Sequence, residues 1–471
     1  MRALCAAGAL IASSGAIARA AAGGSEVTAL AGADVVDGTG GPAIRDAVVL
    51  LEGDRITAVG PRAAVAIPAG ATVVDLAGRF LVPGLIDAHV HFFQSGGLFT
   101  RPDVIDLRAT RSYADEIAWI RSRLPSTFAR YLACGVTAVA DVGGPMWNFE
   151  VRALAEQADL APRVAVAGPL VSTWQPPQLA CDDPPILEVR DAEEARALVR
   201  RELEREPDLV KIWFIHRRGD DLARQSGLVR AAIEESHAAA VRVAVHATQL
   251  EVARAAVTAG ADVLVHSVDD RPVDDAFVQL LLDRDVVYTT TLVVHEGYQE
   301  ILGQAIDLTE IERRCGDPEV IATWAELSRL PEGRAGGRGA PRPRPPTNPV
   351  MLQNLKRLAD AGVAIAAGTD AGNIGTLHGP SIHRELELMR DAGLAPAQIV
   401  HAAAWGGARV MGREADLGTI EPGKLADLLV LSADPLEDVA HLRRIELVVK
   451  GGRRLDPSAL LERANAPAAS R

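Results

Sequence analysis

Two histidines spaced two residues apart, His89 and His91, follow an apolar run and the turn Pro83-Gly84. Alternate residues of a β-strand project to the same face, so a strand in this position would present both imidazoles on one side. Two imidazoles on one face can bind one metal ion. A His-x-His pair is also found as two ordinary polar residues on a strand, so the rest of the sequence must decide between these interpretations.

Four further polar residues lie in or at the ends of short runs of apolar and β-branched residues. They are Lys211 within 209–214, His246 at the end of 241–246, His266 at the end of 261–266, and Asp370 at the end of 363–370. Catalytic groups of a parallel barrel come from the carboxyl ends of several different strands. Six such polar residues in corresponding places therefore predict one metal site.

Strand-like and helix-like segments alternate along the middle of the chain. Further strands are predicted at 135–141, 163–168 and 286–292, and helical stretches such as 227–240 and 353–361 lie between strands. Alternation of this kind predicts a parallel sheet of the α/β class. Eight such units predict a TIM-type (β/α)8 barrel, here placed at 83–416.

Taken together, these motifs resemble those of the amidohydrolase superfamily, in the branch similar to imidazolonepropionase and to binuclear Xaa-Pro dipeptidase-like enzymes. The resemblance extends from about Val27 to about Arg453. It rests on Gly84–His91, Val210–Ile212, Val245–Ala247, Val265–Ser267, Gly368–Gly372 and the specific tail motif Leu417–Leu428. It implies a small β-sandwich domain built from both termini, here 25–82 plus 417–460.

The same resemblance implies the ligand set. His89, His91 and Asp370 would hold one divalent metal ion, and His246 and His266 would hold a second. Lys211 would bridge the two ions as a carbamate. Imidazole and carboxylate ligands favour zinc, with manganese, cobalt and nickel as alternatives.

Lysine chemistry supports this role for Lys211. Burial in an apolar strand lowers the pKa of a lysine, and only the neutral amine reacts with CO₂ to form a carbamate. The alternative is an edge-strand lysine that reaches solvent. Lys211 alternates with Leu209 and Trp213, which favours a position inside the barrel.

A site of this kind predicts hydrolysis of a C–N bond in an amide or dipeptide-like substrate by a metal-bridging hydroxide. Asp370 would act as general base and then as general acid. Two alternatives remain open: hydrolysis of an ester or lactone at the same site, and a scaffold without catalytic activity. The bridging lysine argues against deamination, because deaminases of this superfamily usually use one metal ion.

The substrate is less well specified. His378, in the loop after the last barrel strand, and His295 and Tyr298, after the seventh, are candidates for substrate contacts. Many dipeptidase-like relatives carry an aromatic residue or a second histidine two positions after the fifth-strand histidine. This chain has Thr248 there, which argues against strict dipeptidase specificity and indicates a roomier pocket.

Composition narrows the class of protein further. The net charge of −13 and the absence of a basic stripe disfavour nucleic-acid binding. After residues 1–22, no apolar run is long enough to span a bilayer. The expected partner is a small-molecule substrate, and a homo-oligomer is left open. Cys5 lies in the predicted leader, 1–22, and its removal leaves Cys134, Cys181 and Cys315. These are an odd number without metal spacing, so no disulfide framework is expected.

Two segments are predicted to lie outside the folded domains. Residues 1–22 combine a short basic start, a small apolar stretch and the sequence Ala18-Arg19-Ala20, which together predict a signal peptide and export to a periplasm or the medium. The alternative is an ordinary disordered N-terminus. Residues 333–349 are rich in proline, glycine and arginine and predict a mobile loop, with a role as a lid or simple disorder both open.

Overall fold

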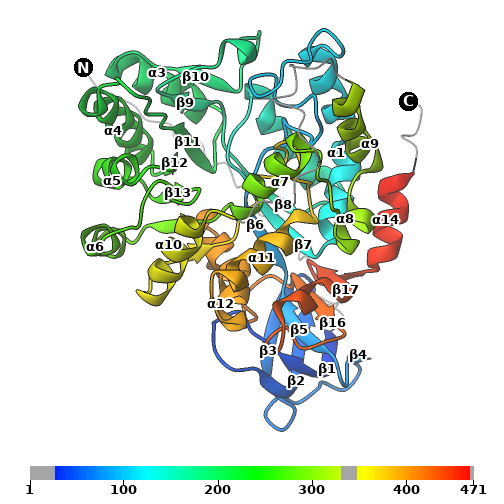
Figure 1. Ribbon diagram of the computed structural model, residues 1–471. Coiled ribbons are helices and arrows are strands. Elements are labelled where there is room, and N and C mark those ends of the chain that lie inside the picture. The colour runs from blue at the N-terminus through cyan, green and yellow to red at the C-terminus, as the bar shows by residue number, and fades with distance from the viewer. Residues whose placement is uncertain (1–26, 330–346, 467–471) are drawn as a thin grey trace, which may run out of the picture.

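Parallel sheets flanked by helices lie beside a separate mixed sheet in the protein (Figure 1). The structure is a computed structural model that describes residues 27–329 and 347–466. The N-terminal strands and the last strands of the chain meet in the mixed sheet, and the segments between them form the parallel sheets and most of the helices.

The parallel strands are short and almost completely buried, as expected for strands with helices packed against them. One sheet has three strands in the order β6-β7-β8, and the other has seven in the order β10-β9-β11-β12-β13-β14-β15. Their bounds are β6 Leu85–Val90, β7 Val136–Asp141, β8 Arg163–Val166, β9 Leu170–Ser172, β10 Ile186–Glu188, β11 Leu209–Trp213, β12 Arg242–His246, β13 Val263–Val265, β14 Val287–Thr289 and β15 Ile365–Ala366.

Backbone hydrogen bonds connect the two parallel sheets at both ends. Ala88 N donates to Ala367 O at 2.9 Å, next to β15. At the other end, Asp208 N donates to Val166 O at 3.0 Å, between β8 and the start of β11. Each of the eight predicted strands has a counterpart among these strands, and this arrangement is consistent with the predicted barrel. Strand pairing is interrupted between β8 and β9, because β8 pairs with β7 and β9 pairs with β11.

Helices alternate with the parallel strands, and side-chain caps fix where several of them begin. Asp191 accepts hydrogen bonds from the first turn of α3, and Asp274 does the same for α6. The helices are α1 Tyr113–Ala133, α2 Phe149–Gln157, α3 Ala192–Leu203, α4 Leu222–Ala238, α5 Leu250–Ala259, α6 Asp275–Asp283, α7 Leu292–Leu302, α8 Glu310–Cys315, α9 Pro318–Thr323, α10 Pro349–Asp360, α11 Ser381–Asp391, α12 Pro396–His401, α13 Gly407–Val410 and α14 Pro457–Asn465.

The mixed sheet contains strands from both ends of the described chain, in the order β18-β17-β16-β5-β1-β2-β3, with β4 paired to β1. Alternate residues of β1 and β2 enter two separate apolar clusters, so both faces of this part of the sheet are covered. The strands are β1 Val27–Val35, β2 Ile44–Glu52, β3 Arg55–Pro61, β4 Thr72–Asp75, β5 Phe80–Pro83, β16 Leu428–Leu431, β17 Ile445–Lys450 and β18 Arg453–Leu455.

A single residue, Gly84, separates β5 of the mixed sheet from β6 of the parallel sheet. Its amide donates to Asp427 O at 2.8 Å, and an added Cβ would lie 2.2 Å from Thr137 Oγ1. Only glycine fits this close approach without a shift of its neighbours. The strand that carries His89 therefore starts directly from the mixed sheet.

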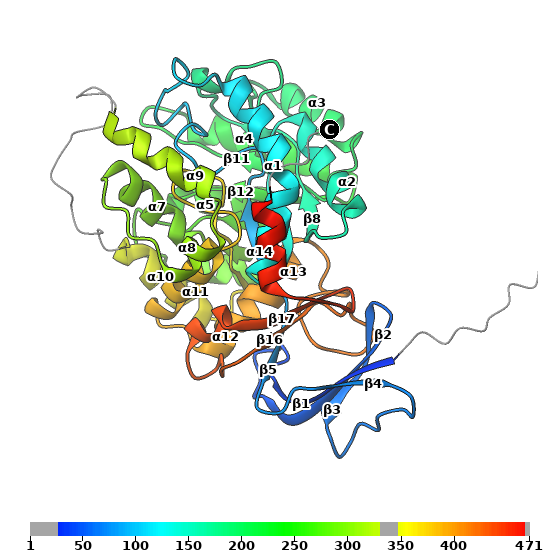
Figure 2. The same ribbon diagram turned by 90° about the vertical axis from the view of Figure 1, so that its right-hand side faces the viewer.

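The C-terminal helix packs along the first long helix, as Figure 2 shows for α14 and α1. Ser126 Oγ donates to Ala464 O at 2.7 Å, and Arg130 donates to Asn465 Oδ1 at 2.6 Å. The end of the described chain is thus fixed to the helix that follows the His-x-His strand.

Some sequence-based expectations differ from the structure or lie outside it. The strand predicted at 286–292 is shorter, because α7 begins at Leu292. The predicted signal peptide, 1–22, and residues 333–346 of the predicted mobile loop lie outside the described residues. The last residues of that loop are part of the fold: Thr347 is buried against Glu296, and Asn348 caps α10. Among the helices of the described ranges, none is long and apolar enough to cross a membrane.

Candidate metal centre

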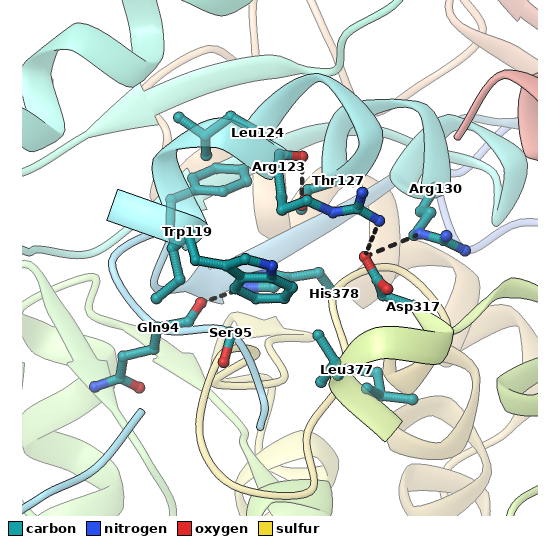
Figure 3. A pocket seen from close by; sticks show the side chains of 13 residues that line it. Gln94, Ser95, Trp119, Arg123, Leu124, Thr127, Arg130, Asp317, Leu377 and His378 are labelled. Carbon is teal, nitrogen blue, oxygen red and sulfur yellow. Dashed lines mark hydrogen bonds and ion pairs between the residues drawn. The ribbon is translucent and has the colours of Figure 1, made fainter. Parts of the chain in front are cut away.

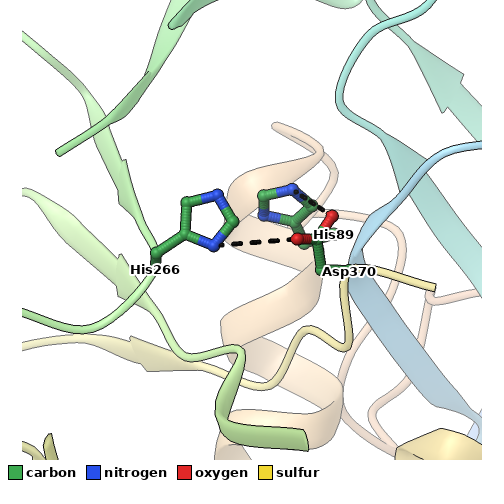
Figure 4. Close-up of side chains that lie close together, drawn as sticks. All are labelled: His89, His266 and Asp370. Carbon is green, nitrogen blue, oxygen red and sulfur yellow. Dashed lines mark ion pairs between the residues drawn. The ribbon is translucent and has the colours of Figure 1, made fainter. Parts of the chain in front are cut away.

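Three of the predicted ligands meet at one point. His89 Nε2 lies 3.4 Å from His91 Nε2, and Asp370 Oδ1 lies 3.4 Å from the first and 3.2 Å from the second. His266 approaches the other oxygen of the same carboxylate, with its Nδ1 4.0 Å from Asp370 Oδ2 (Figure 4). Single donor atoms of His89, His266 and Asp370 all lie within 4.8 Å of one another.

These separations fit a bound metal ion. Ligand atoms about 2.05 Å from a tetrahedral zinc ion lie roughly 3.3 Å from one another. The three distances among His89, His91 and Asp370 are close to that value. Nitrogen and carboxylate donors at this spacing could therefore serve as ligands of a single ion.

Hydrogen bonds orient two of the imidazoles. His91 Nδ1 lies 2.7 Å from the carbonyl oxygen of Gly143, which can only accept, so Nδ1 carries the proton and the Nε2 lone pair faces Asp370. His266 Nδ1 contacts Thr291 Oγ1 at 2.8 Å, which leaves its Nε2 available to a ligand. Partners of this kind fix the orientation of metal-binding histidines.

Other donor atoms at the site lack a partner. Among the residues that the structure describes, no hydrogen-bond partner is within reach of Lys211 Nζ, His246 Nδ1 or His89 Nδ1, although all three atoms are buried. Buried polar atoms are almost always satisfied, so an unpaired group in a native fold calls for an explanation. The ring centroids of His246 and His266 are 4.4 Å apart, which places a second pair of imidazoles beside the first.

Burial also sets the charge of these groups. It lowers the pKa of His89 and of His246 to about 3, so both imidazoles are neutral near pH 7 and keep a lone pair for a metal. Burial lowers the pKa of Lys211 to about 7, against the opposing effect of Asp370. Burial alone would raise the pKa of Asp370, but His89 and His91 outweigh it and hold this pKa well below the usual range.

The backbone at two of the ligands adopts a conformation that is uncommon for residues with side chains. His266 has φ 73° and Asp370 has φ 60°, both in the left-handed region. Residues held in this region cost of order 1–3 kcal/mol each and cluster at functional sites. Just before Asp370, an added Cβ at Gly368 would lie 2.7 Å from His89 Cβ, so glycine allows the two ligand segments to approach closely.

Two buried carboxylates hold the ligand segments in place. Asp87 accepts hydrogen bonds from Thr369 N at 3.0 Å and Thr369 Oγ1 at 2.6 Å, which ties the His-x-His strand to the segment of Asp370. Asp141, at the end of β7, accepts from Phe92 N at 3.0 Å and from Gly143 N at 3.1 Å. The positions of His89, His91 and Asp370 thus depend on the ends of three strands.

A cavity of about 430 Å³ opens from this cluster. Its lining includes the predicted ligands His91, Lys211, His246, His266 and Asp370. Three residues singled out for the substrate side of the site, His295, Tyr298 and Thr248, line the same cavity. The volume lies within the range of roughly 300–1,000 Å³ that is common for small-molecule sites.

The cavity also contains residues that sequence reasoning missed. Arg101 donates to Tyr298 Oη at 2.9 Å and to Asn373, and it forms a two-point ion pair with Asp103. Arg101 and Asp103 lie in an irregular loop, where no periodic pattern indicates which side chains face the site. Trp213 also lines the cavity, and its position two residues after Lys211 was a signal that could have found it.

His378 is not brought into this cavity, although the sequence suggested a substrate contact. Its Nδ1 lies 2.8 Å from Tyr131 Oη and its Nε2 lies 2.9 Å from Gln94 O, so both ring nitrogens have partners. The ring stacks on Phe92 and borders a separate small cavity that Trp119 and Arg130 also line (Figure 3). Tertiary packing thus makes His378 a buried, hydrogen-bonded histidine next to the site.

A second buried histidine, His383, allows a test of how folding stability depends on pH. Burial lowers the pKa of His383 to about 3, and its Nε2 contacts Cys134 O at 3.0 Å. The unfolded chain, with an ordinary pKa of about 6.5, takes up a proton first as the pH falls, so folding stability decreases below about pH 6.5. At pH 5 this residue alone is expected to cost about 2 kcal/mol of unfolding free energy relative to pH 7.5.

The measurement is denaturant unfolding of wild type and His383→Gln at pH 7.5 and pH 5. The variant should lose less stability on acidification than wild type, so the difference between the two proteins should change with pH. His441→Gln, which alters a half-buried histidine bonded to Asp434 O, serves as the control. A constant difference between wild type and His383→Gln would contradict the prediction.

Comparison with known proteins identifies the family. The model of the amidohydrolase family matches residues 80–455, which includes all of the predicted ligands. The chain belongs to the amidohydrolase family. This amidohydrolase is therefore a hydrolase that acts on carbon–nitrogen bonds, as its sequence predicted.

Individual relatives of the amidohydrolase are distant but cover nearly its whole length. Imidazolonepropionase of Streptomyces griseus is 26% identical over 439 residues, covering 86% of this chain and 90% of the relative. An uncharacterized protein of Mycobacterium tuberculosis is 26% identical over 390 residues, covering 82% and 87%. The crystal structure of a putative prolidase from Bifidobacterium longum superposes with a TM-score of 0.66 at 27% identity, covering 94% of this chain and all of the other.

Proposed function

We propose that the protein is an exported, binuclear metal-dependent hydrolase that cleaves the C–N bond of an amide or dipeptide-like substrate. The observation that carries the proposal is the convergence of His89, His91 and Asp370 beside a buried Lys211 amine without a partner. The likeness to a putative prolidase and to an imidazolonepropionase supports the choice of a C–N bond.

The proposed ligand set follows the donor atoms. His89, His91 and Asp370 hold one ion, with zinc favoured by the nitrogen and carboxylate donors. His246 and His266 hold the other. A pKa of about 7 leaves a large neutral fraction of the Lys211 amine near neutral pH, so this amine can react with CO₂ and bridge the two ions as a carbamate. That reaction also removes the unpaired buried amine.

The side chains of the cavity define what the protein itself contributes to the reaction. When bound, two divalent ions lower the pKa of a water molecule and polarise the scissile carbonyl. Asp370, ionised at neutral pH, accepts the proton of the attacking water at a carboxylate oxygen and delivers it to the leaving nitrogen. His295 and Tyr298 line the same cavity and are proposed to contact the substrate.

The organisation of the whole chain completes the proposal. We assign 83–416 to a closed (β/α)8 barrel and 25–82 plus 417–460 to a β-sandwich domain, supported by the backbone bonds between the parallel sheets and by the mixed sheet. Residues 1–22 are proposed as a signal peptide, on their sequence alone. N-terminal sequencing of the protein recovered from the periplasm or medium tests this, and an intact Met1 there would overturn it.

Metal content tests the binuclear assignment directly. After loosely bound ions are removed, the active protein is expected to hold close to two equivalents of zinc or another divalent metal per chain, because six ligand side chains surround the site. The measurement is elemental analysis alongside activity. Removal of metal with a chelator should abolish activity, and added zinc should restore both the metal content and the activity. Full activity at one equivalent would show that the site is mononuclear.

A further inference from the structure

The cavity has an aromatic wall next to the predicted ligands. Trp213 lines the cavity from the end of β11, with its ring 5.9 Å from that of His246 and 5.7 Å from that of Trp174. Both tryptophans are only partly buried, so part of each indole remains accessible. A substrate group bound beside His246 therefore lies next to an indole ring.

The same side of the cavity is apolar. Leu170, Leu179 and Ile186 form one buried cluster against Trp213 and also line the cavity. They come from β9, the short turn after it and β10, all outside the strands that carry ligands. These four side chains present an uncharged surface whose shape suits a flat apolar group.

The lining of the cavity also includes Arg101, whose charge is already paired with a carboxylate. Arg101 Nε donates to Asp103 Oδ1 at 2.8 Å, and Nη2 donates to Asp103 Oδ2 at 2.6 Å. Its remaining terminal nitrogen donates to Tyr298 and Asn373. Both members of the ion pair are largely buried, with side-chain exposures of 17% and 9%. A substrate carboxylate would have to displace Asp103 to reach this guanidinium.

We propose that the cavity selects amides whose leaving group is uncharged and aromatic and stacks on Trp213. Asp103 excludes substrates with a carboxylate there, because it is already paired with Arg101. This inference rests on the proposed function and narrows its substrate class. It separates the protein from enzymes that require a free carboxylate on the substrate, such as those that cleave unmodified dipeptides.

The first experiment compares two matched anilides in the metal-loaded protein: an N-acetylanilide with a 4-methyl group and the same compound with a 4-carboxylate. Wild type is expected to favour the methyl compound in kcat/KM by about tenfold or more, since an unpaired buried charge is strongly disfavoured. Asp103→Asn frees Arg101 and should shift this preference at least about fivefold toward the carboxylate, through KM of the anionic compound.

A surface pair provides the matched control. Arg108 and Asp106 form the same two-point ion pair, exposed to solvent outside the cavity. Asp106→Asn should leave the substrate preference unchanged. A wild-type preference for the carboxylate, or an Asp103→Asn variant with an unaltered preference, would overturn the inference.

A second variant tests the aromatic wall. Trp213→Ala should lower kcat/KM for the 4-methylanilide relative to an N-acetyl alkylamide by about two- to tenfold, the range expected for one aromatic contact, and Trp213→Phe should restore most of it. An equal loss for aromatic and alkyl amides, or no rescue by phenylalanine, would mean that Trp213 has only a structural role.

Binding separates this inference from the proposed function. If the metal-loaded protein hydrolyses none of these amides, the proposed function fails, and calorimetric binding of the same two anilides decides the inference. Tighter binding of the methyl compound by wild type, with a shift toward the carboxylate in Asp103→Asn, supports the subsite. Equal binding, or tighter binding of the carboxylate by wild type, overturns it.

Discussion

Replacing Lys211 with alanine is expected to reduce kcat/KM by on the order of 10³-fold, because a metal site provides several kcal/mol of transition-state stabilisation and the variant lacks its proposed bridge. The side chain is buried at 1% exposure, and within the described part of the chain its amine has no partner that alanine would leave unpaired. The fold should therefore persist while metal content falls below two equivalents.

Chemical rescue makes this prediction specific. Short carboxylic acids such as acetate or propionate, added with metal, should restore part of the activity. They would supply the missing carboxylate in the space left by the Lys211 side chain. Lys356→Ala is the control, since Lys356 pairs with Asp360 on the exposed side of α10. Wild-type activity and two equivalents of metal in Lys211→Ala would show that Lys211 has only a structural role.

Asp370→Asn is expected to lower amide turnover by about 10²- to 10⁴-fold, the usual contribution of a positioned acid–base group. An amide nitrogen is a poor leaving group until it is protonated, whereas an ester or lactone oxygen leaves more readily. The variant should therefore lose less activity toward a matched ester than toward the amide. The measurement is kcat/KM for one amide and ester pair in both proteins, with metal content determined in parallel.

The outcomes of this experiment separate two claims. Equal losses for amide and ester would show that Asp370 does not act through proton delivery, and would leave its role as a ligand. Turnover of lactones alone by wild type would contradict the choice of a C–N bond and favour the ester or lactone alternative. Asp360→Asn, on the exposed side of α10, controls for the loss of a carboxylate elsewhere.

The convergence of the candidate ligands was predictable because these residues lie on regular elements. His89, His91, His246, His266 and Asp370 are at or just beyond strand ends, and the period of two decides which way such side chains point. The carboxyl ends of parallel strands then bring together residues that are far apart in the sequence. The observed distances among His89, His91 and Asp370 agree with that reasoning.

Other parts of the site depend on tertiary packing, which no local pattern contains. The ion pair of Arg101 and Asp103 is placed by an irregular loop, so neither residue could be assigned to the cavity. His378 follows the correct strand, yet its ring is turned toward Tyr131 and Gln94 instead of the ligands. A histidine close to a site in the sequence and a histidine that faces it cannot be distinguished by spacing alone.

The mixed sheet has a consequence for the order in which the protein folds. During synthesis, β5 emerges several hundred residues before its antiparallel partner β16, yet Gly84 alone separates it from the His-x-His strand. Long-range pairing of this kind slows folding, because a large loop must close before the contact forms. A nascent chain that lacks β16 leaves one edge of β5 unpaired, and Asp370 pairs with His89 only after the whole intervening chain has emerged. The candidate metal centre therefore has to form late, after synthesis of the β6 to β15 region. A chain terminated before β16 is expected to accumulate as an aggregation-prone intermediate.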